Sequence, residues 1–387
     1  MESKNTRLLL LLMLGAVLVV GQLYVTLPLT QALASRWQIT SGQAAWAGSA
    51  FGFAYAAGFL LLGRLSDRVG RRAVLLLSLL ATAVASVLVA VSMHFGMLLA
   101  ARALQGLVAA AFPPAALALV AEALPPARRP LGISLMSFAF LAAAPLAQFL
   151  AAQFAGLGLP AIMLALAAAY GLLAVGLHRS LPAGVALVNR AVAVTAPVPM
   201  WRQTHLMGVW LTAVTVLFAF VVFHAGAQTF GLSAGELQAL RLAGLPPLLL
   251  SIAAARLVSR IGTVATARTG LVLAAIGLVS GLAGTFGWLL MASVLLSAGM
   301  ALAVPGLIGT VANRATPDIR AQAIALYTFS LFVGASVAPP VAQALAPLGW
   351  NALLLTPIAA LLCAAAVVNG WTPSHSRLQS SSERRAS

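Results

Sequence analysis

Apolar segments about as long as a membrane is thick recur along this whole sequence and constrain its fold more than any other feature. A single transmembrane helix needs about 20 apolar residues. The chain has 387 residues, of which 62% are hydrophobic and only 7% are charged, and its mean hydropathy is +1.03. A water-soluble domain carries roughly 25% charged residues, so these segments must face lipid.

Twelve such segments can be placed as membrane spans. They lie at residues 8–30, 42–62, 73–93, 97–120, 131–153, 161–177, 206–229, 236–255, 268–286, 288–311, 321–343 and 350–369. Because lipid offers no hydrogen bonds to the backbone, segments of this length cross it as helices. The sequence therefore predicts an all-α integral membrane protein with twelve transmembrane helices.

The basic residues are distributed unevenly, and their distribution orients the chain. The formal net charge is +16 and the pI is about 11.9, values that in a soluble protein would suggest a nucleic acid partner. With the N-terminus inside, only Arg36 of the 22 Lys and Arg residues falls in an outer loop, and Arg102 and Arg241 fall within spans. This is the positive-inside pattern. We expect a multi-pass protein of the inner (cytoplasmic) membrane, surrounded by lipid, with both termini cytoplasmic and no nucleic acid partner.

The chain also repeats itself. Residues 63–70 align with residues 255–262 at an offset of 192 positions, and the same offset places Pro113 on Pro305. A register that holds from the second span to the loop after the fourth indicates a parallel repeat of two six-helix halves. We expect a first bundle at residues 1–178, a cytoplasmic linker at 179–205, a second bundle at 206–370 and a basic, disordered cytoplasmic tail at 371–387.

The loop between the second and third spans carries the most specific motif. Residues 63–72 read Gly-Arg-Leu-Ser-Asp-Arg-Val-Gly-Arg-Arg. Glycines permit tight turns, and a carboxylate can accept hydrogen bonds from arginines or lie at the positive end of a helix. The block resembles the cytoplasmic loop signature of the major facilitator superfamily, Gly-x-Leu-x-Asp-Arg-x-Gly-Arg-Arg. The matching residues are Gly63, Leu65, Asp67, Arg68, Gly70, Arg71 and Arg72.

This resemblance implies a cytoplasmic gate. In such a gate Asp67 contacts the start of the eleventh span and holds the cytoplasmic side shut in one state. Glu122 and Arg128 bracket the next cytoplasmic loop and are similar to the acidic and basic pair that the family places after its fourth span. We expect Glu122 to pair with Arg128, Arg129 or Arg68. The alternative is that the arginines only bind anionic lipid and fix the topology, and that Glu122 is a solvated charge.

Arg102 is the most informative residue inside a span. Residues 102–106 read Arg-Ala-Leu-Gln-Gly, which resembles the family's fourth-span Arg-x-x-Gln-Gly motif. A charge near the bilayer centre is costly, so it normally faces a cavity or a partner. The resemblance implies that Arg102 lines the transport cavity, supports the first span or takes part in proton coupling, with hydrogen bonds to Gln22, Tyr24 or Gln105. The alternative is a side chain that snorkels to the outer interface.

Further candidates for the cavity carry weaker signals. Tyr24 and Pro28 form a Tyr-x-x-x-Pro pattern similar to one in the drug-efflux branch of the family. Pro145 lies where antiporters of the family have a Gly-Pro pair, but Ala144 replaces the glycine. Aromatic residues that can line an apolar cavity, although each is individually more often part of the packing, are Trp46, Tyr55, Phe138, Phe140, Tyr327 and Phe329.

Two ionisable residues in the second half complete the candidates. His224 can titrate near neutral pH, but a histidine near a span end is more often an interfacial hydrogen-bonding group. Arg241 either lines the cavity or forms a local ion pair with Glu236, five residues before it. No acidic residue lies deep in a predicted span, so proton coupling would need Glu122, Glu236 or a histidine.

The whole chain resembles a twelve-span transporter of this family, in particular bacterial drug- and sugar-efflux permeases. The resemblance implies alternating access, in which the two halves rock about a site at the membrane midplane. We expect proton-coupled export of a small, largely apolar molecule by a monomer, driven by the proton gradient. The other cargos that stay open are a sugar, an amino acid or another metabolite, imported or exported.

Nothing in the sequence supports an enzyme. The single cysteine, Cys363, excludes a disulfide framework and a cysteine metal cluster. The sequence lacks a His-Glu-x-x-His pair, a nucleophile elbow and a phosphate-binding loop. We therefore expect no cofactor and no metal, and a membrane receptor or enzyme is a poorly supported alternative.

Overall fold

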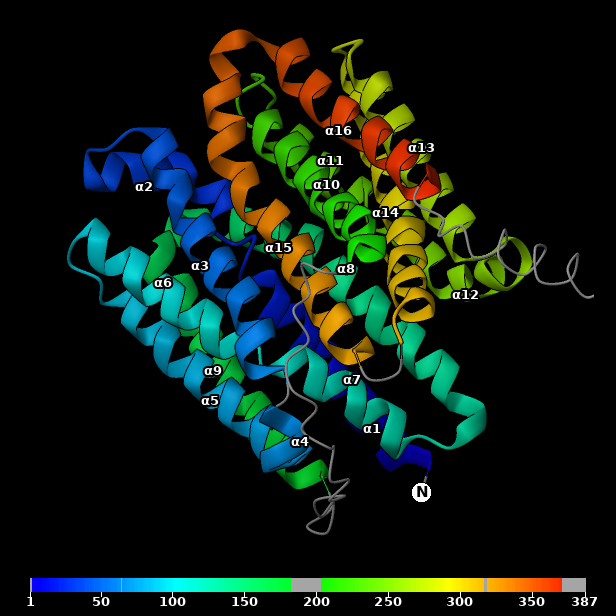
Figure 1. Cartoon of the computed structure of the whole chain (residues 1–387). Helices are drawn as coiled ribbons and strands as arrows, with labels where there is room; N and C mark the ends of the chain where they lie inside the picture. Colours follow the sequence, from blue (N-terminus) through cyan, green and yellow to red (C-terminus); the bar gives the residue numbers. More distant parts are fainter. Residues whose placement is uncertain (1, 64, 182–202, 317–318, 371–387) are drawn as a thin grey trace, which may run out of the picture.

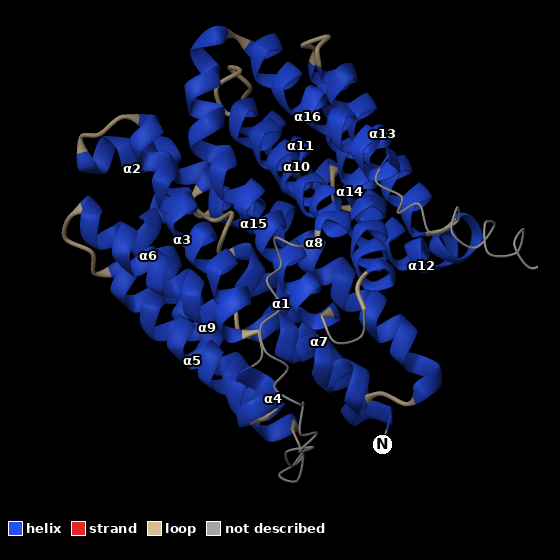
Figure 2. Cartoon of the chain, viewed as in Figure 1, coloured by secondary structure: helices blue, strands red, loops and turns tan. Residues whose placement is uncertain are grey.

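The computed structural model of the chain describes residues 2–63, 65–181, 203–316 and 319–370, with their side chains except at residues 2–4, 66, 67, 369 and 370. Every regular element in these ranges is a helix (Figure 2). Most of the predicted linker, at 182–202, and the predicted tail at 371–387 lie outside the described residues.

Twelve apolar helical segments form the bundle (Figure 1). Eleven are long and apolar enough to cross a membrane, and the shorter Asn5–Gly21 is the twelfth. In chain order the spans are α1 (Glu2–Gly21), α3 (Ser41–Leu62), α5 (Arg71–Ala90), α6 (Phe95–Ala109) with α7 (Phe112–Ala123), α8 (Arg129–Gln153), α9 (Gly158–Ser180), α10 (Thr204–Ala227), α11 (Ala234–Ala243) with α12 (Leu250–Ile261), α13 (Thr263–Gly281), α14 (Phe286–Arg314), α15 (Arg320–Leu345) and α16 (Trp350–Gly370). Short helices α2 (Thr30–Trp37) and α4 (Leu65–Val69) lie between spans. The predicted fold class is confirmed.

The first span differs from the prediction of one continuous helix. Helix α1 ends at Gly21, residues 22–26 form a turn, and a short 3-10 helix leads into α2. Pro28 has no backbone N–H and cannot continue an α-helical ladder. The turn instead forms bonds to the third residue back, such as Tyr24 N to Gly21 O at 2.8 Å. Backbone carbonyls of this turn are thereby left for side chains to satisfy.

The fourth and eighth spans are interrupted in a similar way. Helix α6 gives way to α7 at Ala110, just before the pair Pro113-Pro114, and α11 ends before Gly244, ahead of Pro246-Pro247. Broken helices in a membrane are tolerated where the protein itself satisfies the freed backbone groups.

The repeat is visible in the helix boundaries. The offset of 192 residues carries Arg71, the start of α5, onto Thr263, the start of α13. It also carries Gly158, the start of α9, onto Trp350, the start of α16. The two halves thus share the same order of elements at nearly the same spacing, as a parallel repeat requires.

The halves meet along two sets of helices. Helix α3 packs along α15, as Figure 1 shows, and α8 packs against α11 and α12. Gly52 of α3 allows a close approach, because a Cβ at that position would overlap the hydroxyl of Ser336 in α15. The contact between α3 and α15 therefore depends on small side chains.

The two ends of the bundle differ in chemistry. At one end lie α4 and the N-termini of α5, α8 and α15, with Arg68, Arg71, Arg128 and Arg320. We call this the arginine-rich end. At the opposite end lie α2, the N-terminus of α3 and the C-terminus of α15.

Packing in the first half predicts the effect of adding a single methyl group. A Cβ at Gly106 in α6 would overlap the backbone oxygen of Phe51 in α3, whereas a Cβ at Gly171 in α9 meets no atom within 4 Å. Gly106→Ala should lower the midpoint of thermal unfolding in detergent, since overpacking costs about 1–3 kcal/mol. Gly171→Ala should leave it unchanged or raise it, because alanine is favoured over glycine in a helix by roughly 0.5–1 kcal/mol. Equal midpoints for the two variants would contradict this packing.

Candidate functional site

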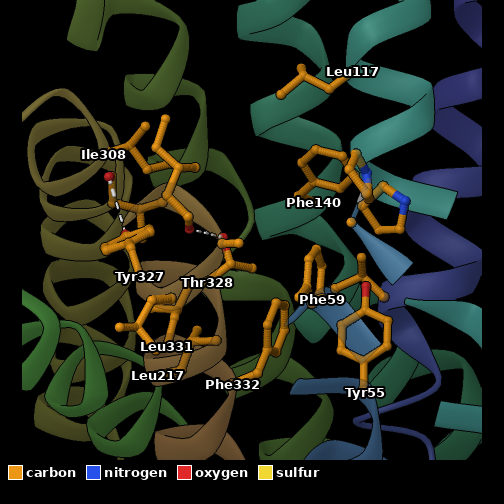
Figure 3. A pocket seen from close by; sticks show the side chains of 18 of the residues that line it. Tyr55, Phe59, Leu117, Phe140, Leu217, Ile308, Tyr327, Thr328, Leu331 and Phe332 are labelled. Atoms are coloured by element: carbon orange, nitrogen blue, oxygen red, sulfur yellow. Dashed lines mark hydrogen bonds between the residues drawn. The ribbon is translucent and has the colours of Figure 1, made fainter. Parts of the chain in front are cut away.

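A cavity of about 1000 Å³ lies between the two halves. Figure 3 shows its wall, to which both halves contribute. The lining side chains include Tyr24, Tyr55, Phe59, Pro113, Leu117 and Phe140 from the first half and Leu217, Ile308, Tyr327, Thr328, Leu331 and Phe332 from the second. A single space bounded by both halves is the place at which a molecule can contact both.

An aromatic cluster closes one end of the cavity. Phe332 of α15 lies edge-on to Tyr55, with ring centroids 4.8 Å apart, and is stacked on Phe59 at 5.5 Å. Tyr55 and Phe59 are themselves edge-on at 5.1 Å. Aromatic pairs in these geometries add to the stability gained from burying the rings. The cluster joins α3 to α15 and so ties the first half to the second.

The cavity reaches the arginine-rich end and is closed toward the opposite end. Its wall extends to Gly63, at the end of α3, and to Ala321, in the first turn of α15. Toward the opposite end the halves are in contact through Gly52 of α3 and through Gln238 of α11, whose amide donates to the carbonyl of Phe149 in α8 at 3.3 Å. The structure is therefore a state that opens at the arginine-rich end.

Few polar groups of the wall are available to a ligand. The hydroxyl of Tyr327 donates to the carbonyl of Val304 at 3.3 Å. Ser137 and Thr328 donate to carbonyls of their own helices, each at 3.0 Å. The hydroxyl of Tyr55, a fully buried residue, has no partner among the described residues. The lining residues include no Asp, Glu, Lys, Arg or His.

Arg102 is fully buried and is held by hydrogen bonds from three directions. Its Nε donates to the carbonyl of Ala47 in α3 at 3.0 Å. One terminal nitrogen, Nη2, donates to the carbonyl of Gln22 at 2.7 Å, and the other, Nη1, to the side-chain oxygens of Gln22 at 3.2 Å and Gln105 at 2.6 Å. The guanidinium also lies over the ring of Phe51, 4.6 Å from its centroid, in a cation–π contact. These bonds offset the cost of a charge at this depth.

This network connects the broken first span to its neighbours. The turn at residues 22–26 frees the carbonyl of Gln22, and Arg102 satisfies it. Gln105 extends the network to α5, since its amide donates to the hydroxyl of Ser86 at 2.7 Å. The Ser86 hydroxyl in turn donates to the carbonyl of Thr82 at 2.7 Å. Arg102 thus joins α1, α3, α5 and α6.

Arg102 bonds to the broken first span, which is one of the expected roles, but it lies at neither of the two expected locations. It does not line the cavity, and it does not extend to the outer interface. It lies behind the wall, with Gln22 and Gln105 as partners, as we expected, whereas Tyr24 is not a partner and faces the cavity instead. Sequence motifs identified the charge and two partners but not the broken helix that places them.

Several charged groups at the arginine-rich end bond within the first half. Arg71 of α5 pairs with Glu122 of α7 at 3.3 Å, a partner that the sequence had not suggested. Arg72 bonds to His178 of α9, through both the ring Nδ1 and the carbonyl, each at 3.3 Å. Gly70 starts α5 with a φ of 98°, which glycine adopts without strain. These bonds hold α5, α7 and α9 together.

The remaining gate candidates lie at the same end. The exposed Arg68 is in α4, and Arg128 directly precedes α8. Gly63 lines the mouth of the cavity. The side chain of Asp67 lies outside the described residues, so its predicted contact with α15 stays a prediction.

Three predicted cavity residues lie away from the cavity wall. Pro145 is buried inside α8. His224 is buried between Phe220 and Phe223, with Nδ1 3.0 Å from the carbonyl of Phe220 and no partner for Nε2 among the described residues. Neither they nor Arg241 are among the residues that line the cavity in this state, and their predicted role in transport stays a prediction.

Arg241 does not form the local ion pair that was its alternative. The carboxylate of Glu236 accepts hydrogen bonds from the N–H and hydroxyl of Ser233, at 2.8 and 2.7 Å, and so caps α11. Arg241 is buried and donates to the side chain of Gln238 at 3.3 Å. Helix capping outcompetes the ion pair because the cap is preformed by the chain's own turn.

Aromatic residues of the wall were partly visible in the sequence. Tyr55, Phe140 and Tyr327 line the cavity as candidates had suggested, whereas Phe59 and Phe332 were missed. The sequence pattern that could have identified Phe59 is its spacing: it lies four residues after Tyr55, which places both side chains on one face of α3.

Known proteins give two findings. The sequence matches the family model described as Major Facilitator Superfamily over residues 12–254 and 208–386. The structure is similar to the crystal structure of the human organic anion transporter MFSD10 (TETRAN), with a TM-score of 0.68, 22% sequence identity, and coverage of 94% of this chain and 99% of the other. At that identity the likeness shows the fold alone. No curated protein matches the sequence significantly.

The Arg102 network predicts a graded response to substitution. Arg102→Ala should lower thermal stability strongly and abolish transport, because it leaves the carbonyls of Gln22 and Ala47 buried without donors, at about 1–3 kcal/mol each. Arg102→Lys should recover only part of the stability, since an ammonium cannot reproduce the planar set of five donors. Exposed Arg36 provides the control: Arg36→Ala should change neither property. Full stability of Arg102→Ala in detergent would contradict the proposed support of the first span.

Proposed function

This chain belongs to the major facilitator superfamily, and we propose that it exports small, largely apolar molecules across the inner membrane by proton-coupled alternating access. The observation that supports this proposal is the cavity between the halves, with its aromatic and aliphatic wall. Its volume of about 1000 Å³ is at the upper end of the range typical of small-molecule sites. We further propose that the chain acts as a monomer and needs no cofactor.

An apolar cargo fits the wall better than a sugar or an amino acid does. Each hydroxyl of a sugar needs a hydrogen-bond partner when it leaves water, and an unsatisfied polar group costs about 1–3 kcal/mol. The hydroxyls of Ser137, Tyr327 and Thr328 already donate to backbone carbonyls. The charged amino and carboxylate groups of an amino acid would find no ion-pair partner among the lining residues. The metabolite alternatives are therefore less favoured.

The charge distribution supports a direction. The positive-inside rule would place the arginine-rich end in the cytoplasm, with both termini there. The cavity would then open to the cytoplasm, the side from which an exporter loads. An apolar molecule could also enter from the adjoining leaflet, and exposed Leu60 in the cavity wall would offer it an apolar surface.

Alternating access would use the two ends differently. The bonds of Arg71 and Arg72 lie within the first half, so they would move with it as one body. Closure at the arginine-rich end would need a new contact between the halves, and Asp67 with the start of α15 is the pair that we propose. The opposite end would open by separation of α3 from α15 and of α8 from α11.

Proton coupling needs a group that binds and releases a proton during the transport cycle. Glu122 is exposed and Glu236 is half-buried, and both lie near helix ends. His224 lies near the seam between the halves, since Phe220, against which it packs, also contacts Tyr24 of the first half. We propose these three residues as candidates for the coupling site.

Transport in inverted membrane vesicles tests the proposed function. With an acidified lumen, a panel of apolar compounds, sugars and amino acids should show accumulation of apolar members only. Each transported compound should release protons from the lumen, which a pH-sensitive dye detects. A protonophore should abolish accumulation, and vesicles without the protein provide the control. Accumulation of a sugar or amino acid in place of apolar compounds would reject the proposed cargo.

The gate proposal predicts a selective loss in one variant. Asp67→Asn should be expressed and inserted like the wild type, yet transport at least about tenfold more slowly, because a lost charge-assisted contact is worth about 1.5–3 kcal/mol. Glu383→Gln is the matched control, an acid-to-amide change in the predicted C-terminal tail, and should leave the rate nearly unchanged. Wild-type turnover in Asp67→Asn at equal expression would refute the gate.

A further inference from the structure

We propose that Tyr55, with Tyr24 beside it, recognises an oxygen acceptor at the polar end of an otherwise apolar cargo, and that the same site rejects a cationic head group. This inference rests on the proposed function, since it specifies the cargo of the same cavity. It concerns which apolar molecules the cavity selects.

The hydroxyl of Tyr55 is a donor without an acceptor. The residue is 0% exposed, lines the cavity and has no hydrogen-bond partner for its hydroxyl among the described residues. Figure 3 shows Tyr55 beside Phe59 in the wall of the cavity. A buried polar group normally has a partner, so an exception of this kind needs an explanation. A ligand atom that accepts the hydrogen bond supplies one.

The ring of Tyr55 is fixed, so its hydroxyl has a defined position. Tyr55 is stacked on Phe51, with centroids 5.4 Å apart, and lies edge-on to Phe332 of the other half. Tyr24 also lines the cavity. Tyr24 is held edge-on to Phe220 of α10. Each phenol hydroxyl can donate one hydrogen bond to an oxygen acceptor.

The charge behind the wall sets the preferred sign. The guanidinium of Arg102 lies over the far side of the same Phe51 ring that stacks on Tyr55. Arg241 is a second buried cation, and no acidic side chain is buried among the described residues. The charge of Arg102 beside Phe51 is positive, and in a low dielectric a charge acts over longer distances than in water. A neutral carbonyl is favoured there, and a carboxylate is favoured over an ammonium.

Binding of four naphthalene compounds to the purified full-length protein in nanodiscs tests this inference. The probes are 2-ethylnaphthalene without a head group, methyl 2-naphthylacetate with a neutral acceptor, 2-naphthylacetate with an anionic acceptor, and 2-(2-naphthyl)ethylamine with a cation. The ester should bind at least about fivefold more tightly than 2-ethylnaphthalene, the ratio that one added hydrogen bond supplies, and the acid should bind more tightly than the amine. The amine should bind more weakly than 2-ethylnaphthalene.

The Tyr55→Phe variant keeps the ring and removes the donor. It should lower the affinity for the ester and the acid by about fivefold and leave that for 2-ethylnaphthalene unchanged. Tyr170→Phe is the matched control, because Tyr170 is equally buried but lies off the cavity and donates to the carbonyl of Leu18 at 2.8 Å. Its ratio of ester to 2-ethylnaphthalene affinity should equal that of the wild type. Tyr24→Phe provides a second variant with the same expected direction as Tyr55→Phe.

The possible outcomes separate this inference from the proposed function. If the amine binds as tightly as the ester or the acid, or if the ester shows no advantage over 2-ethylnaphthalene in the wild type, the head-group site is refuted while the apolar cavity stands. An unchanged ratio in both Tyr55→Phe and Tyr24→Phe also refutes it. If none of the four probes binds, the proposed apolar cargo itself is wrong.

Discussion

The bonds of Arg102 to two backbone carbonyls are the interaction on which the first half depends. A span that breaks at residues 22–26 would otherwise expose unpaired carbonyls in an environment without water. The planar guanidinium reaches the carbonyls of Gln22 and Ala47 at once and so joins α1 to α3. Tyr24 lies in the turn that follows α1, and Tyr55 lies in α3. The position of both hydroxyls in the cavity wall therefore follows from a charge that the cargo does not touch.

The two ends of the molecule are held by different kinds of contact. Toward the opposite end the halves are joined by close packing of small and aromatic side chains, such as Gly52 against Ser336 and Tyr55 against Phe332. At the arginine-rich end the ion pair of Arg71 with Glu122 joins helices of the same half. Exposed ion pairs contribute little to stability, typically less than about 1 kcal/mol. They fix the geometry of the half without resisting movement between the halves.

Sequence reasoning gave the fold because its signals are local and repeated. Each span is marked in the sequence by a run of about 20 mostly apolar residues. The repeat is a second such signal, because the offset of 192 residues carries Arg71 onto Thr263 both in the sequence and at the helix starts of the structure. The break after Gly21 was not predicted, since Pro28 alone is compatible with a kink as well as with a break. The location of Arg102 was missed for the same reason: which face of α6 meets the turn depends on a backbone path that no local pattern specifies.

The wall residues show a second limit of the sequence. Phe59 and Phe332 are ordinary apolar residues in apolar spans, and only the pairing of α3 with α15 makes them neighbours. The residue type alone does not tell whether an aromatic side chain in a span faces lipid, the protein core or the cavity. Charged residues such as Arg102 and Arg241 are easier to identify because they are rare at this depth, although rarity does not say whether they face the cavity.

Buried polar groups near the closed seam bear on how the other state becomes accessible. The amide of Gln148 in α8 and Nε2 of His224 in α10 have no partners among the described residues, and Arg241 in α11 has a single side-chain partner. Each unsatisfied group destabilises the closed seam. Separating α8 from α11 would admit water to such groups while it exposes apolar surface that favours closure. Hydration of the polar groups favours opening, and exposure of apolar surface opposes it. The open and closed states of the seam are therefore closer in free energy than they would be with an entirely apolar seam. A carrier that alternates between two states needs such a balance, because a modest binding energy must then be enough to shift the population.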